Sequence, residues 1–222
     1  RSLAGTNADA IQHSLSELSQ IDSERKIGLL NAALARASMS APPKSVWLDL
    51  YEISVGIPNS KLALSNFLES QIEGNELGIA SLSIEGGNPG KGESLFQHHP
   101  AQCIRCHQID GFGGSAGPDL SKVGGTLNRQ EILESLLNPN KRIAPGFEST
   151  TIDLTEGDVI SGIVQLETDQ DLILRLADRS THTVSKQKIS YRSKQQSSMP
   201  PMGGVLSRRE LRDLVSYLAE RK

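Results

Sequence analysis

The stretch that decides the interpretation of this 222-residue chain is Cys103-Ile104-Arg105-Cys106-His107. Two thiols three positions apart, followed directly by a histidine, are the pattern through which haem is attached covalently. Each thiol adds to one vinyl group of the porphyrin, and the imidazole is then placed to bind the iron from its proximal side. The chain has only two cysteines, and both lie here, so no disulfide framework or four-thiolate metal site competes for them. We therefore expect Cys103 and Cys106 to hold one haem c, with His107 as its proximal ligand.

Other uses of the two thiols remain open. A Cys-x-x-Cys pair can be a dithiol redox centre, which is typical of a thioredoxin-like βαβ setting, or half of a zinc site. The flanking residues indicate a short helix and a glycine-rich loop, which disfavours the redox pair. His98 and His99 lie near enough in sequence to join His107 and the thiolates around a zinc ion. A zinc or dithiol protein without haem is therefore one alternative hypothesis.

The sixth iron ligand has to come from another part of the chain, and the three methionines are the candidates. Met39 is far from the haem motif in sequence, whereas Met199 and Met202 lie just ahead of a C-terminal helical segment. A methionine followed by proline is held in extended backbone, so we favour Met199 over Met202. Ligation by histidine and methionine is the arrangement of electron-transfer haems. If no methionine binds the iron, the open site would be that of a haem sensor or haem enzyme.

The C-terminal segment has the pattern of an amphipathic helix. Ser207-Arg-Arg-Glu210 has the form of a capping box, which marks a helix start. Apolar residues then recur at helical spacing and define one face: Leu211, Leu214, Val215 and Leu218. Upstream of the cysteines, residues 88–96 indicate another short helix, which contains Gly90 and Gly92.

These two segments, and the loop after the haem motif, resemble the cytochrome c fold. In that fold the first and last helices cross closely, which here implies a contact between Gly92 and Tyr217. The glycine-rich loop 111–120, which ends in Gly-Pro-Asp-Leu, is also similar to its counterpart in cytochromes c. The resemblance implies that the carbonyl of Pro118 accepts a hydrogen bond from His107 and so fixes the imidazole ring. The glycines of the loop would let the backbone pass close to the flat porphyrin.

The order of motifs over residues 87–222 resembles, more specifically, the haem-binding domain of planctomycete and verrucomicrobial multidomain proteins. The matching motifs are Cys-x-x-Cys-His, Gly-Pro-Asp-Leu, an Asn-Pro pair after a helical segment, a β-rich stretch and Ser-x-Met-Pro, in which the methionine is Met199. The resemblance implies an electron-transfer module, not itself an enzyme, that accepts single electrons from an associated dehydrogenase domain or another redox partner. It also implies export to the periplasm, because haem is attached to this motif outside the bacterial cytoplasm. The resemblance covers little of residues 1–86.

Two further segments differ from the haem-binding part in their periodicity. Residues 1–86 carry helical apolar spacing and predict a helical bundle or the end of a helical repeat, with helices over 8–18, 23–37, 44–55 and 59–72. Residues 147–191 predict a small antiparallel SH3-like unit inserted ahead of Met199, with strands over 150–154, 159–166, 172–176, 181–185 and 188–192. The predicted class is therefore mainly α: a cytochrome c fold over 87–222 with a β insertion, preceded by a helical segment.

Charge and hydropathy limit the partners. The net charge is −3 and there is no strong basic run, which argues against nucleic acid or an anionic membrane surface as a partner. No stretch approaches the length of an apolar membrane span. The chain begins with Arg1 and shows no signal peptide, so we expect it to be a piece of a longer protein.

Overall fold

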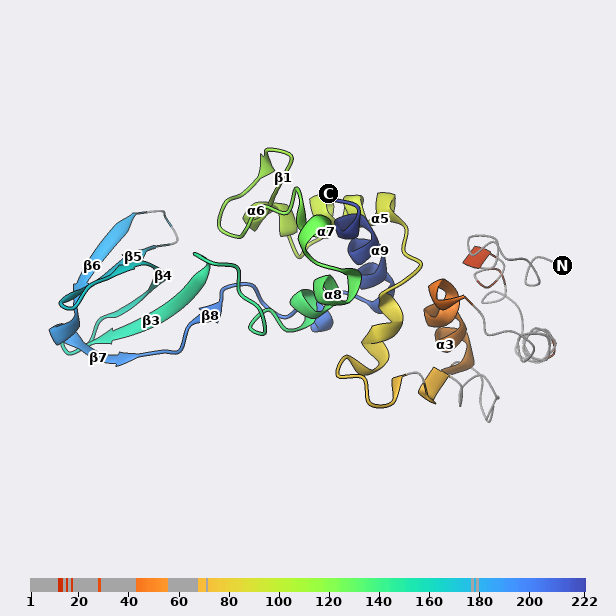
Figure 1. Ribbon diagram of the computed structural model, residues 1–222, viewed down its shortest axis with the longest axis horizontal. Coiled ribbons are helices and arrows are strands. Elements are labelled where there is room, and N and C mark those ends of the chain that lie inside the picture. Colours follow the sequence, from red (N-terminus) through yellow and green to blue (C-terminus); the bar gives the residue numbers. More distant parts are fainter. Residues whose placement is uncertain are drawn as a thin grey trace.

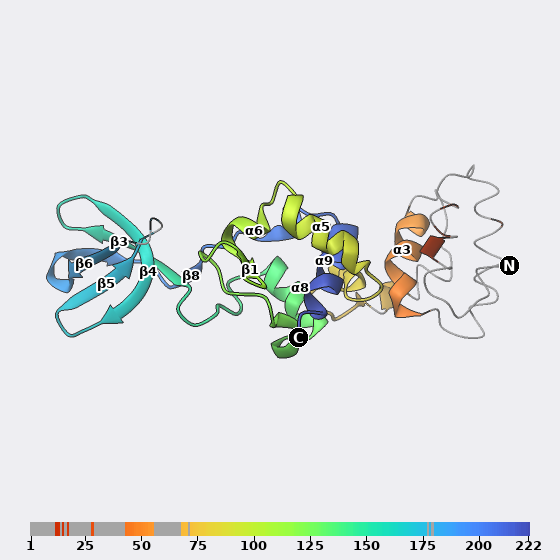
Figure 2. The ribbon, with the colours of Figure 1, turned by 90° about the horizontal axis from the view of Figure 1, so that it is seen from above.

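The computed structural model describes residues 43–55, 68–70, 72–176, 178 and 180–222, as well as Gln12, His13, Leu15, Glu17 and Gly28. Three parts follow one another along the longest axis (Figure 1). Helix α3 (Trp47–Val55) lies at one end, a helical part that contains the C-terminus lies in the middle, and an antiparallel sheet lies at the other end. The same order is seen from above (Figure 2). The Cys-x-x-Cys-His motif belongs to the middle part.

The middle part consists of short helices around one apolar core. Its helices are η3 (Gly78–Ser83), α5 (Pro89–His98), α6 (Cys103–Cys106), α7 (Val123–Thr126), α8 (Arg129–Leu137), η5 (Met202–Gly204) and α9 (Arg208–Ala219). A small hairpin follows the haem motif and is made of β1 (Gln108–Ile109) and β2 (Phe112–Gly113). Side chains from α5, α8 and α9 form the core, which includes Phe96, Ile132, Leu133, Leu214 and Val215.

Side-chain caps set the starts of the three longest helices in this part. The Ser207 hydroxyl accepts a hydrogen bond from the Glu210 amide, and the Glu210 carboxylate accepts one from the Ser207 amide at 2.8 Å. The predicted capping box is therefore confirmed. The same type of box, formed by Asn128 and Glu131, begins α8, and the side chain of Asn88 caps α5.

Helices α5 and α9 cross at a glycine. A Cβ atom at Gly92 would lie 2.1 Å from the carbonyl oxygen of Asp213 and 2.7 Å from the Cβ of Tyr217. No other residue type leaves room for this approach, so the predicted contact between Gly92 and Tyr217 is confirmed. The rings of Phe96 and Tyr217 lie beside the crossing, with their centroids 6.0 Å apart.

The sheet contains the predicted strands and one more. Its strands are β3 (Glu148–Leu154), β4 (Val159–Glu167), β5 (Asp171–Arg175), β6 (Thr181–Ser185), β7 (Ile189–Arg192) and β8 (Gln196–Ser197), with η4 (Lys186–Lys188) between β6 and β7. All neighbours are antiparallel in the order β6-β5-β4-β3-β7, and β8 also pairs with β3. The sheet has a buried core of its own, formed by Ile152, Leu172, Leu174 and Val184.

The expectation of a mainly α protein with a minor SH3-like insertion is wrong. The strands form a six-stranded antiparallel sheet with a separate core, so strand structure is a second major component of the chain. The sequence patterns located five of the strands but underestimated β3 and β4, which reach seven and nine residues. They also missed β8, a two-residue strand whose pairing with β3 depends on residues almost 50 positions away and leaves no local pattern.

Helix α3 and the preceding η2 (Lys44–Val46) agree with the predicted helix over 44–55. The carboxylate of Asp49 on α3 forms ion pairs with two arginines of α9. The guanidinium nitrogens of Arg209 and Arg212 lie 3.3 and 2.6 Å from its oxygens. The other predicted N-terminal helices and Met39 lie wholly or largely outside the described residues, so the organisation of residues 1–86 stays a prediction. In the described part of the chain, no helix combines the length and the apolar character needed to cross a membrane.

Candidate functional site

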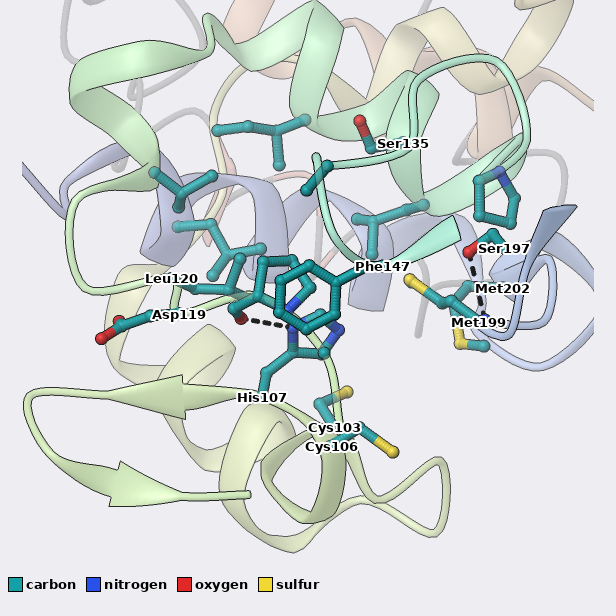
Figure 3. A pocket seen from close by; sticks show the side chains of 18 of the residues that line it. Cys103, Cys106, His107, Asp119, Leu120, Ser135, Phe147, Ser197, Met199 and Met202 are labelled. Atoms are coloured by element: carbon teal, nitrogen blue, oxygen red, sulfur yellow. Dashed lines mark hydrogen bonds between the residues drawn. The ribbon is translucent and has the colours of Figure 1, made fainter. Parts of the chain in front are cut away.

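A cavity of about 530 Å³ opens between the haem motif, α8, α9 and the segments that lead to and from the sheet. All five sequence-predicted site residues line it: Cys103, Cys106, His107, Pro118 and Met199. Figure 3 labels four of them, the two cysteines, His107 and Met199. Most of the other lining side chains are apolar, among them Phe96, Leu120, Ile132, Leu136, Leu214 and Leu218. A large, mainly apolar cavity with a few convergent polar groups is typical of a cofactor site.

Helix α6 brings the two thiols together. It is a single turn that begins after Gln102, whose backbone has a positive φ of 55°, and the His107 amide closes it by donating to the Cys103 carbonyl at 2.9 Å. Figure 3 shows the two cysteine side chains beside each other, below His107 in this view. Cys103 is partly buried and Cys106 is exposed, and burial raises the pKa of the Cys103 thiol. Both cysteines are free thiols.

The ring of His107 is fixed by the backbone of the following loop. Its Nδ1 lies 2.9 Å from the carbonyl oxygen of Pro118, as the family resemblance implied. Because a carbonyl oxygen only accepts, Nδ1 carries the proton and Nε2 keeps its lone pair. Burial is the main cause that lowers the pKa of His107, and the hydrogen bond to Pro118 opposes it. The site therefore favours a neutral imidazole with Nε2 as its metal-binding atom.

Two glycines of loop 111–120, Gly114 and Gly117, approach other parts of the protein closely. A Cβ at Gly114 would lie 1.8 Å from the Arg105 carbonyl oxygen, and one at Gly117 would lie 2.7 Å from Cε1 of the His107 ring. The Gly117 amide also donates to the Cys106 carbonyl at 2.7 Å. The loop thus folds back on α6 and packs directly against the imidazole.

Both candidate methionines line the cavity, in different settings. Met199 is half-buried in the loop between β8 and η5, and its amide donates to the Ser197 hydroxyl at 3.1 Å. Met202 is the first residue of η5, is only 5% exposed and belongs to the apolar core. Figure 3 shows the two side chains on the side of the pocket away from Asp119, with His107 between.

The segment between α8 and β3 is the part of the site that sequence reasoning missed. Pro139, Ile143, Ala144, Pro145 and Phe147 all line the cavity. Their apolar character was visible in the sequence, but no periodicity or motif tied them to the haem motif. They face the cavity because β3 pairs with β8 and so brings this segment beside the loop that carries Met199.

The zinc alternative finds no geometric support among the described residues. His99 has other contacts: its Nδ1 accepts from the Ala101 amide at 3.0 Å, and its Nε2 lies 3.6 Å from Glu210. The Nδ1 atom of His98 lies 3.2 Å from the Ser94 carbonyl on its own helix. The described part of the chain contains no group of three or more histidine, cysteine or carboxylate side chains placed to hold a metal ion.

Comparison with known families agrees with the geometry. Residues 90–153 match the family model described as Cytochrome c. The match runs from α5 into β3 and includes both cysteines, His107 and Pro118, while Met199 lies outside it. It supports a c-type cytochrome that binds haem and transfers electrons. No curated protein matches the chain.

Proposed function

We propose that this chain is a monohaem c-type cytochrome module that passes single electrons. The observation that carries the proposal is the orientation of His107: its Nδ1–H donates to the Pro118 carbonyl, which leaves Nε2 as the ligand atom in a cavity that two thiols and two thioethers also line. Cys103 and Cys106 would hold one haem covalently, and His107 and Met199 would be its axial ligands. When bound, the haem iron supplies the one-electron redox chemistry.

The residues present fit this group. The two thiols stand one helical turn apart at the cavity, which is the spacing that thioether attachment at two vinyl groups requires. Apolar side chains from α8 and α9 line part of the cavity wall and so lower the local dielectric. Pro118 keeps the imidazole in one tautomer, and Gly117 packs against its ring, so that the ligand does not rotate.

We further propose that the module receives its electrons from a dehydrogenase domain or a separate dehydrogenase, and that it works in the periplasm. Support for the donor comes from the resemblance over residues 87–222 to haem-binding domains of multidomain proteins. Support for the compartment comes from the site of haem attachment and from the usual export of cytochrome c domains. The module itself contributes binding, orientation and axial ligands, and we assign it no catalytic residue.

The direct test is covalent haem. Protein expressed for export with the haem-attachment machinery should exceed the chain mass by one haem and keep its colour after acid–solvent extraction. It should be reduced and re-oxidised reversibly, with the spectrum of a six-coordinate c-type haem. Cys103→Ala and Cys106→Ala should each leave little loaded protein. Haem that extracts freely, or stoichiometric zinc in its place, would refute the proposal.

A further inference from the structure

The loop that carries Met199 is tied to the rest of the protein just before the methionine. Strand β8 pairs with the start of β3, with Ser197 opposite Glu148 and Gln196 opposite Ser149. The Ser149 hydroxyl also donates to the Gln196 carbonyl at 2.8 Å. The chain therefore leaves the sheet at Ser197, two residues ahead of Met199.

The residues before β8 are anchored as well. The Ser193 amide donates to the Thr151 carbonyl at 2.9 Å. In return, the Ser193 hydroxyl accepts from the Thr151 amide at 2.9 Å. Thr150, which is buried, donates its hydroxyl proton to the Ser193 carbonyl at 3.0 Å. The segment 193–197 is therefore held to β3 at both of its ends, and Met199 follows two residues after the last of these anchors.

The side chain of Asn140, which lies outside the sheet, holds the chain at Ser197 by a hydrogen bond. The Oδ1 atom of Asn140 accepts a hydrogen bond from the Ser197 amide at 2.8 Å. The Ser197 hydroxyl in turn accepts from the Met199 amide at 3.1 Å. Asn140 stands three residues after α8, whose Leu136 is buried in the core and lines the cavity. These two hydrogen bonds form a relay from Asn140 through Ser197 to Met199. The relay links the end of α8, which forms one wall of the cavity, to the backbone of Met199.

We propose that Asn140 is a positioning residue for Met199: through Ser197 it holds the loop so that the thioether stays over the cavity. This inference rests on the proposed function, in which Met199 is the axial ligand. Asn140 is exposed, so its removal should cost little global stability. The loss should instead appear in the equilibrium between bound and displaced methionine.

The size of the effect follows from one hydrogen bond. A typical intramolecular hydrogen bond shifts an equilibrium by a factor of roughly 2 to 10. Asn140→Leu removes the acceptor while keeping a similar volume, so the fraction of molecules with a displaced methionine should rise by about that factor. External ligands reach the iron through this fraction, so carbon monoxide should bind the reduced protein faster by the same factor.

The experiment uses the haem-loaded chain and three variants. Carbon monoxide binding to the reduced protein is followed by stopped flow, the sulfur-to-iron near-infrared band of the oxidised protein is recorded, and thermal unfolding is measured in parallel. Asn140→Leu should speed carbon monoxide binding and weaken the band without a matching loss of thermal stability. Asn140→Asp keeps an acceptor oxygen and should retain the wild-type band and rate. Asn138→Leu, an exposed asparagine two residues earlier and outside the relay, is the matched control and should behave as wild type.

The outcomes separate this inference from the proposed function. If the wild-type band is present and Asn140→Leu matches wild type in band and rate, the positioning role is wrong and methionine ligation stands. If Asn138→Leu changes the rate as much as Asn140→Leu, the effect belongs to the end of α8 in general and the relay is likewise rejected. If the wild-type protein lacks the band, methionine ligation itself fails, and the inference fails with it.

Discussion

Arg212 of α9 donates a hydrogen bond of 2.6 Å to Asp49 of α3, and both side chains are almost fully buried, at 8% and 4% exposure. The pair joins residues 163 positions apart in sequence. The chain between them also passes close to α9, because a Cβ at Gly87 would lie 2.2 Å from the Arg212 carbonyl oxygen. Helix α3 is therefore anchored to the same helix that crosses α5 beside the haem motif.

Breaking this ion pair from one side should be costly. Asp49→Ala leaves the Arg212 guanidinium buried without its counter-charge, which typically costs about 3–5 kcal/mol. The midpoint of denaturant unfolding should fall accordingly. The matched control is Glu52→Ala, which removes a partner of the partly exposed Arg209 and should cost only about 0–1 kcal/mol. Equal effects of the two changes would mean that α3 does not pack on α9 in solution.

At the crossing of α5 and α9, replacing either of two nearby glycines by alanine should change the stability of the protein in opposite directions. A Cβ at Gly92 would strike the Asp213 carbonyl oxygen, which is backbone and cannot turn away, so Gly92→Ala should destabilise the protein by about 1–3 kcal/mol. At Gly90 the nearest atom to such a Cβ is the Asn88 Oδ1 at 3.4 Å. Gly90→Ala should therefore be neutral or stabilise the helix by up to about 1 kcal/mol. Thermal unfolding of both variants checks this; a loss at Gly90 equal to that at Gly92 would contradict the crossing.

The two thiols should differ in reactivity before haem is attached. Burial raises the pKa of Cys103, and the thiolate is the form that reacts, so in the haem-free chain at pH 8 iodoacetamide should modify the exposed Cys106 first. As the pH rises through the raised pKa of Cys103, its thiolate fraction grows and the difference between the sites should narrow. Peptide mass spectrometry over time measures both rates. In urea, where burial is lost, the two rates should converge; a preference that persists there would have another cause.

Local patterns in the sequence were enough to locate the haem motif, the capping box at Ser207 and five of the strands. The contact between Gly92 and Tyr217 was also predicted, from the resemblance to cytochromes c. Each of these depends on residues near one another in sequence or on a familiar order of motifs. The predicted mainly α class is wrong because the inserted strands form a six-stranded sheet with a buried core of its own.

What the sequence could not provide are the contacts between distant segments. Asp49 and Arg212 are ordinary charged residues of two separate helices until the fold buries them together. Asn140 and Ser197 meet only because β8 lies beside β3, and the pairing of so short a strand has no periodicity of its own. Phe147 reaches the cavity for the same reason. These partners are chosen by tertiary packing, which single-residue preferences do not encode.

The last prediction separates the two methionines. Thioether sulfur favours ferrous over ferric iron and raises the reduction potential. Met199→Ala should therefore abolish the near-infrared sulfur-to-iron band of the oxidised protein, lower its reduction potential and open the iron to carbon monoxide or cyanide. Met202 is buried in the core, so Met202→Ala should keep the band but cost about 2–5 kcal/mol of stability. Met202→Leu, which conserves volume, should keep the band at a cost below about 1.5 kcal/mol. The reverse pattern, with the band lost in both Met202 variants and kept in Met199→Ala, would assign the ligand to Met202. A wild-type protein that lacks the band and binds carbon monoxide readily would instead have the open sixth site of a haem sensor or haem enzyme.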